Sequence, residues 1–373
     1  MFRPVRYSLA MVETHPDRPR KGRGALANPT GRFEPHARVA VDDGWGGEDG
    51  DEDDAPPPLR TTVGTDASRT VIARNASPDV PFDRSINPYR GCEHGCVYCF
   101  ARPTHAFLGL SPGLDFETKL FAKPNAARLL EAELARPSYR PEVIALGTNT
   151  DPYQPIERRL GITRRILEAL WRARHPVAIV TKSHLVERDL DILAPMAAAR
   201  LVRVMVSVTT LKPALARTME PRAPRPALRL AAVRGLAEAG VPVGVLAAPM
   251  IPALNDEELE AILAAAAEAG ATSAGYVLLR LPLEIKDLFG EWLEAHFPER
   301  KARVLNLVRQ TRGGKLYDSA WFTRQRGRGP YAELLERRFA LACRRLGLNR
   351  NVWELDITRF RRPHGPAEQL ALF

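Results

Sequence analysis

Three of the four cysteines in the 373-residue chain lie in one short segment, where Cys92, Cys96 and Cys99 have the spacing C-x3-C-x2-C. Thiolates are soft ligands that suit iron–sulfur clusters, zinc or copper. A closed zinc site usually takes four protein ligands as two pairs, and no second pair follows here. Three thiolates suit a [4Fe–4S] cube with one iron left open, since the ordinary cube takes four cysteines. The alternatives are zinc bound with His94 or the distant Cys343, and buried free thiols.

The cysteine segment resembles that of the radical S-adenosylmethionine superfamily, in which an aromatic residue, here Tyr98, precedes the last cysteine. The longer run from Ile86 to Arg102 is similar to the branch related to spore photoproduct lyase, and the likeness extends over about residues 79–282. The resemblance implies an enzyme with a [4Fe–4S] cluster and S-adenosylmethionine, served by a reductant such as flavodoxin or ferredoxin. In that superfamily a 5′-deoxyadenosyl radical takes a hydrogen atom from the substrate, while the protein binds and orients.

Between residues 80 and 280, short apolar runs alternate with amphipathic helices, which is typical of βα units on a parallel sheet. The first expected strand ends at residues 87–89, and the others cover residues 143–146, 177–180, 201–208, 243–247 and 276–279. Six such units match the partial (β/α)6 TIM-type barrel that the resemblance implies. Sites in barrels of this kind lie at the carboxyl ends of the strands.

Polar residues just after the expected strands are candidates for holding the cofactor. Related proteins commonly have a GGE-like segment after the second strand; this chain has none, so we assign that role to Thr148 and Asn149. In the related lyases a lysine and a serine after the next two strands touch the cofactor, and Lys182 and Ser207 occupy these places. An ordinary surface lysine and a strand-end hydroxyl are the alternative interpretations.

The net charge of +10 is distributed unevenly. Residues 41–54 hold eight acidic residues and no Lys or Arg, whereas residues 300–362 hold 17 Lys and Arg against five acidic residues. A basic surface attracts phosphate backbones, although an Arg-rich solvated exterior would give the same composition. The nucleic-acid contacts that we expect are Arg222, Arg225, Arg324, Arg326 and Arg328, with aromatics such as Trp321 and Phe322 either stacking on bases or packing internally.

Composition divides the chain into four parts. Residues 1–60 are expected to be mostly disordered, with the acidic run; residues 61–310 form the barrel, 311–362 a basic extension and 363–373 a flexible tail. Residues 22–34 fit either an ordered arm or a flexible basic segment. The sequence has no 18-residue apolar run and no apolar leader, and its few cysteines fit a reducing compartment, so we expect a cytoplasmic protein.

The chain ends in Ala-Glu-Gln-Leu-Ala-Leu-Phe, which resembles the peptide Gln-Leu-x-Leu-Phe that binds the bacterial DNA polymerase sliding clamp. The resemblance implies that the clamp is a partner, with contacts from Gln369, Leu370, Leu372 and Phe373. The alternative is a tail that folds back on the protein's own core.

These observations favour an enzyme acting on DNA or another nucleic acid, in repair. The alternatives are the same chemistry on tRNA, a protein or a small molecule, and a non-enzymatic zinc and nucleic-acid-binding module. In spore photoproduct lyase a further cysteine donates a hydrogen atom to the product, but here no cysteine lies between Cys99 and Cys343. Cys343, Tyr98 or Tyr153 would have to replace it, or the reaction differs.

Overall fold

The computed structural model describes residues 19–34, 59–351 and 353–363. Its main sheet has six parallel strands in chain order, flanked beside β3 by the antiparallel β2 (Ile72–Arg74). The parallel strands are β3 (Arg84–Ile86), β6 (Ile144–Leu146), β7 (Val177–Thr181), β8 (Val202–Ser207), β9 (Val243–Met250) and β10 (Ser273–Leu278). The expected partial (β/α)6 barrel is confirmed, and it is open because the strand order runs from β10 to β2 without closing.

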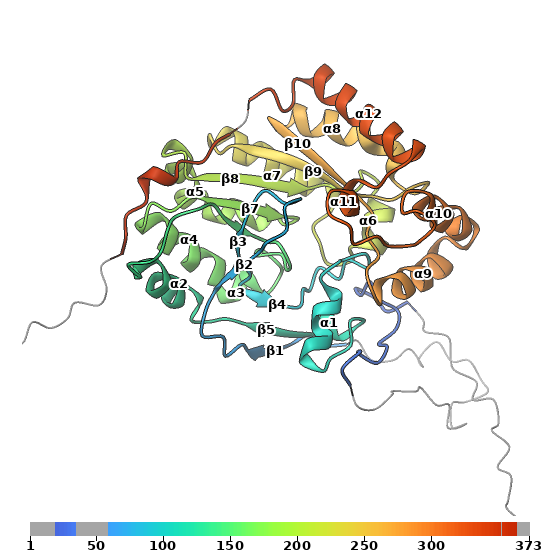
Figure 1. The fold of residues 1–373 in the computed structure, drawn as a ribbon, viewed down its shortest axis with the longest axis horizontal. Helices are drawn as coiled ribbons and strands as arrows, with labels where there is room; N and C mark the ends of the chain where they lie inside the picture. Colours follow the sequence, from blue (N-terminus) through green and yellow to red (C-terminus); the bar gives the residue numbers. More distant parts are fainter. Residues whose placement is uncertain (1–18, 35–58, 352, 364–373) are drawn as a thin grey trace, which may run out of the picture.

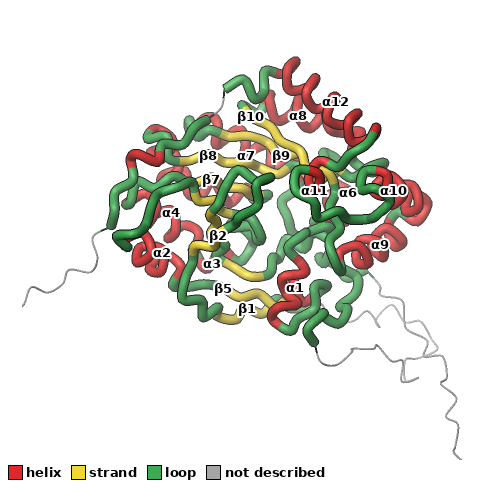
Figure 2. Tube along the Cα trace, viewed as in Figure 1, coloured by secondary structure: helices red, strands yellow, loops and turns green. Residues whose placement is uncertain are grey.

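Helices cover the outer face of this sheet (Figure 1, Figure 2). They are α2 (Ala126–Ala135), α3 (Glu157–Leu160), α4 (Ile162–Arg172), η3 (His184–Asp189), α5 (Leu190–Ala198), α7 (Pro226–Glu238), η4 (Asp256–Glu258) and α8 (Leu259–Glu268). Helix α6 (Pro213–Met219) instead packs against the cysteine segment, where Leu215 and Met219 are buried with Cys96 and Val97. The apolar faces of the covering helices bury side chains such as Ile166 and Leu263 in one continuous core with the strand residues. Each fully buried side chain of this kind contributes about 1.5–3 kcal/mol to the stability of the fold. This core therefore holds the strands and helices in fixed positions relative to one another.

The chemistry of single residues sets several of these boundaries. Pro226 stands at the first position of α7, where its missing N–H costs no hydrogen bond. Gly240 follows the same helix with φ +73°, a conformation that glycine adopts without strain. The valines of β7 and β8 favour extended backbone, and Val202, Val204 and Val206 of β8 are all buried on one face of the sheet.

A small second sheet lies below the barrel in Figure 1 and was not expected from the sequence. In it β5 (Lys119–Ala122) pairs with β1 (Thr62–Thr65) on one side and with β4 (Tyr89–Arg90) on the other. Strands of two to four residues are too short to show an alternating pattern. The sheet matters for function because β4 leads directly into the cysteine segment, with η2 (Arg102–Leu108) and α1 (Asp115–Thr118) following.

The basic C-terminal stretch packs along the barrel. After β10 come α9 (Ile285–His296), α10 (Pro298–Gln310), α11 (Thr323–Arg326), α12 (Pro330–Leu346) and η5 (Ile357–Arg359). Arg312 donates to the carbonyls of Leu278 and Leu279, which places residues 311–328 at the carboxyl end of β10. Helix α12 lies against α8 on the outside (Figure 1).

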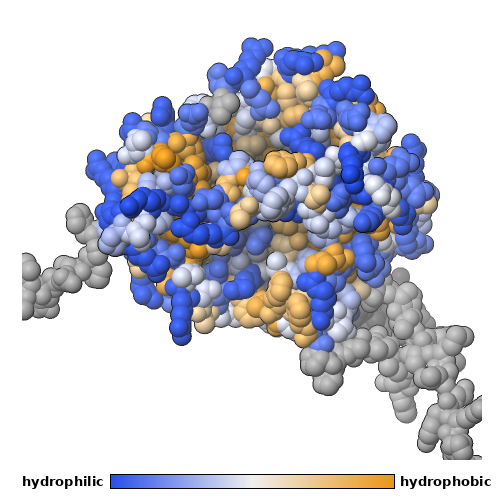
Figure 3. Space-filling view, viewed as in Figure 1, coloured by the Kyte–Doolittle hydropathy of each residue, from blue (hydrophilic) through white to orange (hydrophobic). Residues whose placement is uncertain are grey.

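Within the described residues no helix is both long enough and apolar enough to span a membrane. The face drawn in Figure 3 carries separate hydrophobic patches surrounded by hydrophilic surface, without a continuous apolar band.

Candidate active site

The segment from Gly91 to Cys99, called here the cysteine loop, begins where β4 ends. Gly91 has φ +74° and a Cβ added there would lie 2.8 Å from the Phe116 carbonyl oxygen, so the turn requires glycine. The Cys92 amide donates to that same carbonyl at 3.0 Å, and the Cys99 amide donates to the Cys96 carbonyl at 3.2 Å. The three cysteines therefore sit on a backbone whose path is fixed by hydrogen bonds.

Arg102 supports the loop from behind. Its guanidinium is fully buried, and its Nε donates to the Cys96 carbonyl at 2.8 Å while one terminal nitrogen donates to the Gly95 carbonyl at 3.1 Å. The remaining donors reach the Pro112 and Gly113 carbonyls and the Glu117 carboxylate, at 3.2, 2.9 and 2.5 Å. All five N–H groups of the guanidinium are thus used. No sequence pattern indicated this role for Arg102.

Residues after β6 hold the front of the loop. The buried Gln154 accepts from the Glu93 amide at 2.8 Å and donates to the Gly91 carbonyl at 3.2 Å. Asp151 pairs with His94 at 3.4 Å and accepts from the Lys182 amide at 2.7 Å. Burial acts to raise the pKa of Asp151, but His94 and these hydrogen bonds lower it below its usual value, so Asp151 stays ionised.

Lys182 and Ser207, which follow β7 and end β8, are brought together at the cysteine loop. The Lys182 Nζ donates to the Ser207 Oγ at 2.8 Å and lies 3.7 Å from Glu220, with the Tyr98 ring 5.8 Å away. The Lys182 side chain is 17% exposed, so its charge is only partly shielded by water. The cofactor roles that we assign to both residues remain a prediction.

The carboxylate of Glu220 lies beneath the polar side chains of Lys182, Ser207 and Tyr98, called here the polar cluster. We did not expect this role of Glu220 from the sequence. Its buried carboxylate accepts hydrogen bonds from Tyr98 and Arg229, and from Thr209 at 2.7 Å. Burial acts to raise the pKa of Glu220, but Arg229 and then Lys182 lower it to about 2. Burial and the nearby Glu220 raise the pKa of Cys96 to about 12, which keeps the free thiol neutral until a metal displaces its proton.

Thr148 and Asn149 lie after β6 and contact the segment between β3 and β4, which leads to the cysteine loop. Asn87, between β3 and β4, donates to the Thr148 Oγ1 at 3.2 Å and accepts from the Asn149 amide at 3.0 Å. Asn149 is exposed, whereas Thr148 is half-buried and its hydroxyl also donates to the Asn87 side chain at 3.4 Å. Their role as cofactor ligands remains a prediction.

Cys343 lies at the other end of the barrel. Its Sγ accepts from the Asn349 side chain at 3.7 Å, and Asn349 in turn bonds Ala274 at the amino end of β10. The cysteine loop lies at the carboxyl ends, so Cys343 is placed neither as a fourth ligand nor as a hydrogen-atom donor. Within the described residues no three His, Cys, Asp or Glu side chains are arranged to hold a single metal ion. Three thiols spread along one loop fit a larger cluster better than zinc.

Ion pairs alter the expected set of phosphate-binding arginines. Arg324 is ion-paired with the buried Asp79 at 2.5 Å and is 17% exposed, so it anchors the 311–328 segment and offers little charge to a ligand. Arg222 pairs with Glu93 at 3.1 Å and Arg328 with Asp318 at 3.2 Å, although both stay exposed. The remaining two, Arg225 and Arg326, are exposed and have no ion pair to a described residue.

Exposed aromatic side chains lie at the same end of the barrel as the cysteine loop. Phe100, next to Cys99, is 44% exposed, and the Arg280 guanidinium lies 5.0 Å from its ring centre. Trp321 and Phe322, on the segment anchored to β10 by Arg312, are 57% and 66% exposed. The pairing of Phe100 with Arg280 was missed because the two residues are 180 positions apart.

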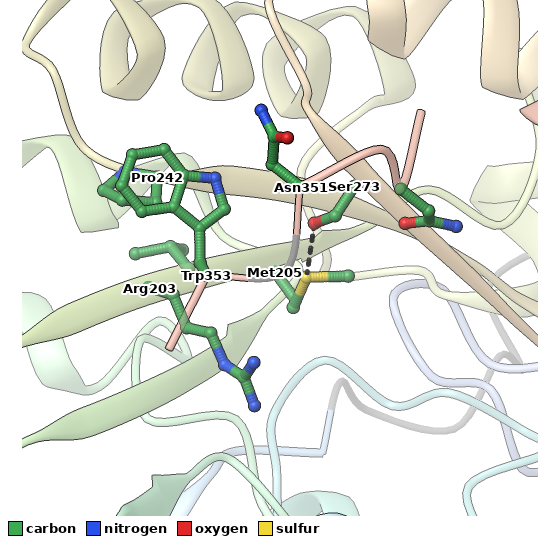
Figure 4. Close-up of a pocket in the computed structure, with 8 residues that line it drawn as sticks. Arg203, Met205, Pro242, Ser273, Asn351 and Trp353 are labelled. Carbon is green, nitrogen blue, oxygen red and sulfur yellow. Dashed lines mark hydrogen bonds between the residues drawn. The ribbon is translucent and has the colours of Figure 1, made fainter. Parts of the chain in front are cut away.

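A hollow of about 260 Å³ lies at the opposite end of the barrel (Figure 4). It is lined by Arg203 and Met205 of β8, Pro242 before β9, Ser273 at the start of β10, and the later Asn349, Asn351 and Trp353. In Figure 4 a hydrogen bond of 3.7 Å joins Ser273 to Met205 across it. These residues are at the amino ends of the strands, so the hollow is separate from the cysteine loop.

Comparisons with known proteins agree with this geometry. Residues 86–266 match the family model described as the Radical SAM superfamily. An uncharacterized protein of Mycobacterium tuberculosis is 42% identical over 233 residues, covering 62% of this chain and 68% of that protein. An uncharacterized protein of Methanocaldococcus jannaschii is 27% identical over 221 residues, covering 59% of this chain and 79% of that protein.

The fold is similar to that of spore photoproduct lyase. A structure of that enzyme complexed with dinucleoside spore photoproduct superimposes with a TM-score of 0.54 at 17% identity, covering 77% of this chain and 80% of that one. A mutant of the enzyme with bound AdoMet and dinucleoside spore photoproduct superimposes with a TM-score of 0.53 at 16% identity, covering 79% of this chain and 82% of that one.

Proposed function

The chain belongs to the radical SAM superfamily, and from this premise we propose that it is a repair enzyme that acts on DNA or another nucleic acid. The superfamily uses a [4Fe–4S] cluster and S-adenosylmethionine. The observation that carries the nucleic-acid part of the proposal is the group of exposed aromatic and arginine side chains beside the cysteine loop.

The cysteine loop has the donor set for such a cluster. Cys92, Cys96 and Cys99 supply three thiolates, and Arg102 and Gln154 fix the backbone that carries them. A [4Fe–4S] cluster held by these three cysteines would supply the reductive cleavage of S-adenosylmethionine and the removal of a hydrogen atom from the substrate. The protein's own task is to bind both molecules, orient them and keep water out.

Lys182 and Ser207 are the groups that we assign to the polar end of S-adenosylmethionine. The Lys182 ammonium group, which lies in the polar cluster beside Ser207, suits a ligand that carries a carboxylate. Glu220 and Arg229 fix this ammonium and Tyr98 in place, because the buried Glu220 carboxylate binds the Tyr98 hydroxyl and lies near the Lys182 Nζ. Thr148 and Asn149 are assigned to the amino group of the same cofactor.

The substrate class is inferred from the surface around the site. Phe100, with the Arg280 guanidinium over its ring, and the exposed Trp321 and Phe322 present aromatic surface at the carboxyl end of the barrel. The exposed Arg326, whose guanidinium lies over the Tyr276 ring, adds positive charge there. Base stacking on aromatic side chains contributes about 1–3 kcal/mol per base and tolerates any sequence. Spore photoproduct lyase, whose fold is similar, binds a dinucleoside photoproduct.

The repair scheme that uses a protein thiol as hydrogen-atom donor is not part of this proposal. Cys343 lies at the far end of the barrel, and Tyr153 is buried in the main core beneath Arg188, 5.9 Å from the guanidinium. Tyr98 is at the site, but its hydroxyl is bound to Glu220 and Thr209. The proposed reaction therefore uses a hydrogen-atom donor other than a protein thiol, or needs no donor.

The proposal is tested by binding and turnover with the anaerobically reconstituted protein. Fluorescence anisotropy with labelled single-stranded DNA, duplex DNA and RNA should show binding that weakens steeply with salt. Replacing Phe100 by Ala should weaken binding, whereas Trp353→Ala, at the opposite end of the barrel and 41% exposed, serves as the exposed-aromatic control. Cleavage of S-adenosylmethionine without binding to any of the three polymers would instead indicate a protein or small-molecule substrate.

The C-terminal peptide adds a second partner to the proposal. Gln369, Leu370, Leu372 and Phe373 lie outside the described residues, so the proposal depends on the sequence alone. Docking on the sliding clamp would hold a repair enzyme on DNA near replication. Titration of purified clamp with the wild-type chain tests it directly, and no binding would remove this partner.

A further inference from the structure

Residues 19–34, called here the N-terminal arm, lie against the back of the cysteine loop. The backbones meet so closely that a Cβ added to Gly24 would lie 1.8 Å from the Gly95 carbonyl oxygen. Farther along the arm, the Ala27 carbonyl oxygen would lie 2.2 Å from a Cβ added to Gly113. Only glycine permits such contact, so Gly24 and Gly113 allow the arm to seat directly on the loop and its support.

The arm completes the hydrogen bonding of the buried Glu117. The carboxylate of Glu117 accepts from the Gly24 amide at 3.0 Å and from the Ala25 amide at 2.9 Å, in addition to its ion pair with Arg102. Arg23 donates to the Glu117 carbonyl at 3.1 Å. A continuous path therefore runs from arm amides through Glu117 to Arg102, and from Arg102 to the Gly95 and Cys96 carbonyls.

Further contacts seal the arm onto the body of the protein. The Asn28 side chain donates to the Asp115 carboxylate at 3.1 Å and accepts from the Asp115 amide at 2.9 Å. Ala25 and Ala27 are buried with Leu114 and with Leu288 of α9. The arm therefore joins α1 to α9 across the back of the cysteine loop and excludes water from Glu117 and Arg102.

We propose that the N-terminal arm is a positioning element for the iron–sulfur cluster, which it stabilises by holding the Glu117–Arg102 pair that fixes the cysteine loop. The inference rests on the proposed ligation by Cys92, Cys96 and Cys99. A buried carboxylate that loses two amide donors must be solvated by water, and water entering there would loosen the carbonyls of Gly95 and Cys96. A site with three protein ligands has no fourth thiolate to compensate for a looser loop.

The first test compares two glycine substitutions in the full-length protein, loaded anaerobically with iron and sulfide. Gly24→Ala brings a methyl group against the loop, whereas Gly290→Ala, in α9, places one in open space, and neither glycine has a left-handed φ. Circular dichroism establishes that each variant folds. We expect Gly24→Ala to lose its visible cluster absorption to a chelator about three- to tenfold faster than wild type, a factor typical of one buried hydrogen bond. Gly290→Ala should match wild type.

The second test needs no variant and therefore holds even where Gly24→Ala does not fold. Hydrogen exchange of the Gly24 and Ala25 amides is measured in the full chain with and without the cluster. Coupling predicts that loading the cluster slows exchange in the arm. Equal exchange in both states, or equal chelator rates for Gly24→Ala and Gly290→Ala, would overturn the role of the arm alone. Wild-type protein that binds no cluster would overturn the ligation, and this inference with it.

Discussion

Replacing Lys182 by Met should weaken binding of S-adenosylmethionine without removing the cluster. Met preserves the length of the side chain but removes the ammonium group that lies 2.8 Å from Ser207 and 3.7 Å from Glu220. Glu220 keeps its ion pair with Arg229, so the buried carboxylate stays compensated and the fold should persist. The change therefore isolates the contribution of one charge to cofactor binding.

The magnitude follows from the burial of the Lys182 side chain. A hydrogen bond to a charged group contributes about 1.5–3 kcal/mol, and at 17% exposure solvent screening reduces it little. Since about 1.4 kcal/mol corresponds to a tenfold change in affinity, the dissociation constant should rise about 10- to 150-fold. Ser207→Ala removes only the hydroxyl that orients the ammonium and should cost about two- to tenfold.

Equilibrium dialysis of S-adenosylmethionine against the reconstituted protein measures this change directly. Iron content, determined in the same samples, shows that the cluster is retained. The matched control is Lys315→Met, which makes the same substitution at an exposed lysine. Lys182→Met protein that retains iron and binds S-adenosylmethionine within twofold of wild type would refute the assigned role.

Three further predictions concern stability, nucleic acid and the tail. Burial lowers the pKa of His175 to about 4, so its contribution to stability is present above about pH 6.5 and falls by about 1.4 kcal/mol per unit as pH drops toward 4. Urea unfolding should show that the difference in the free energy of unfolding between wild type and His175→Gln shrinks as the pH drops over that range. A difference that stays constant would contradict the prediction. Replacing Arg326 and Arg328 by Met should reduce the salt dependence of nucleic-acid binding by about two units of slope, measured by anisotropy; Arg324→Met should instead lower the unfolding midpoint, because it leaves Asp79 unpaired. Replacing Leu372 and Phe373 by Ala should abolish binding to purified sliding clamp, and equal affinity of the variant and wild type in calorimetry would exclude the tail as the contact.

The parallel sheet could be predicted because its strands and helices carry strong local patterns. Buried strands such as β7 and β8 are rich in valine, α7 begins at Pro226 and is followed by Gly240, and α8 is followed by Gly270. The positions of Lys182 and Ser207 followed from those strands, since each comes where a strand ends. Local sequence therefore sufficed wherever a residue's role depends on its own strand.

The supporting contacts could not be predicted, because each joins residues that are far apart in the chain. Glu220 meets Tyr98 across 122 positions, and Glu117 meets the Gly24 amide across 93. Nothing in composition or spacing identifies such a pair. The ion pair of Arg324 with Asp79 shows the same limit, since a basic stretch does not reveal which of its arginines are already neutralised.

The most direct test of the central claim is production of 5′-deoxyadenosine by the anaerobically reconstituted protein with dithionite and S-adenosylmethionine. The wild-type chain should form it, and Cys96→Ala should not, because two thiolates cannot retain the cluster. Cys343→Ala should behave as wild type, since Cys343 lies at the opposite end of the barrel. Equal production by Cys96→Ala and wild type, or none by a wild-type protein that carries iron, would contradict the account.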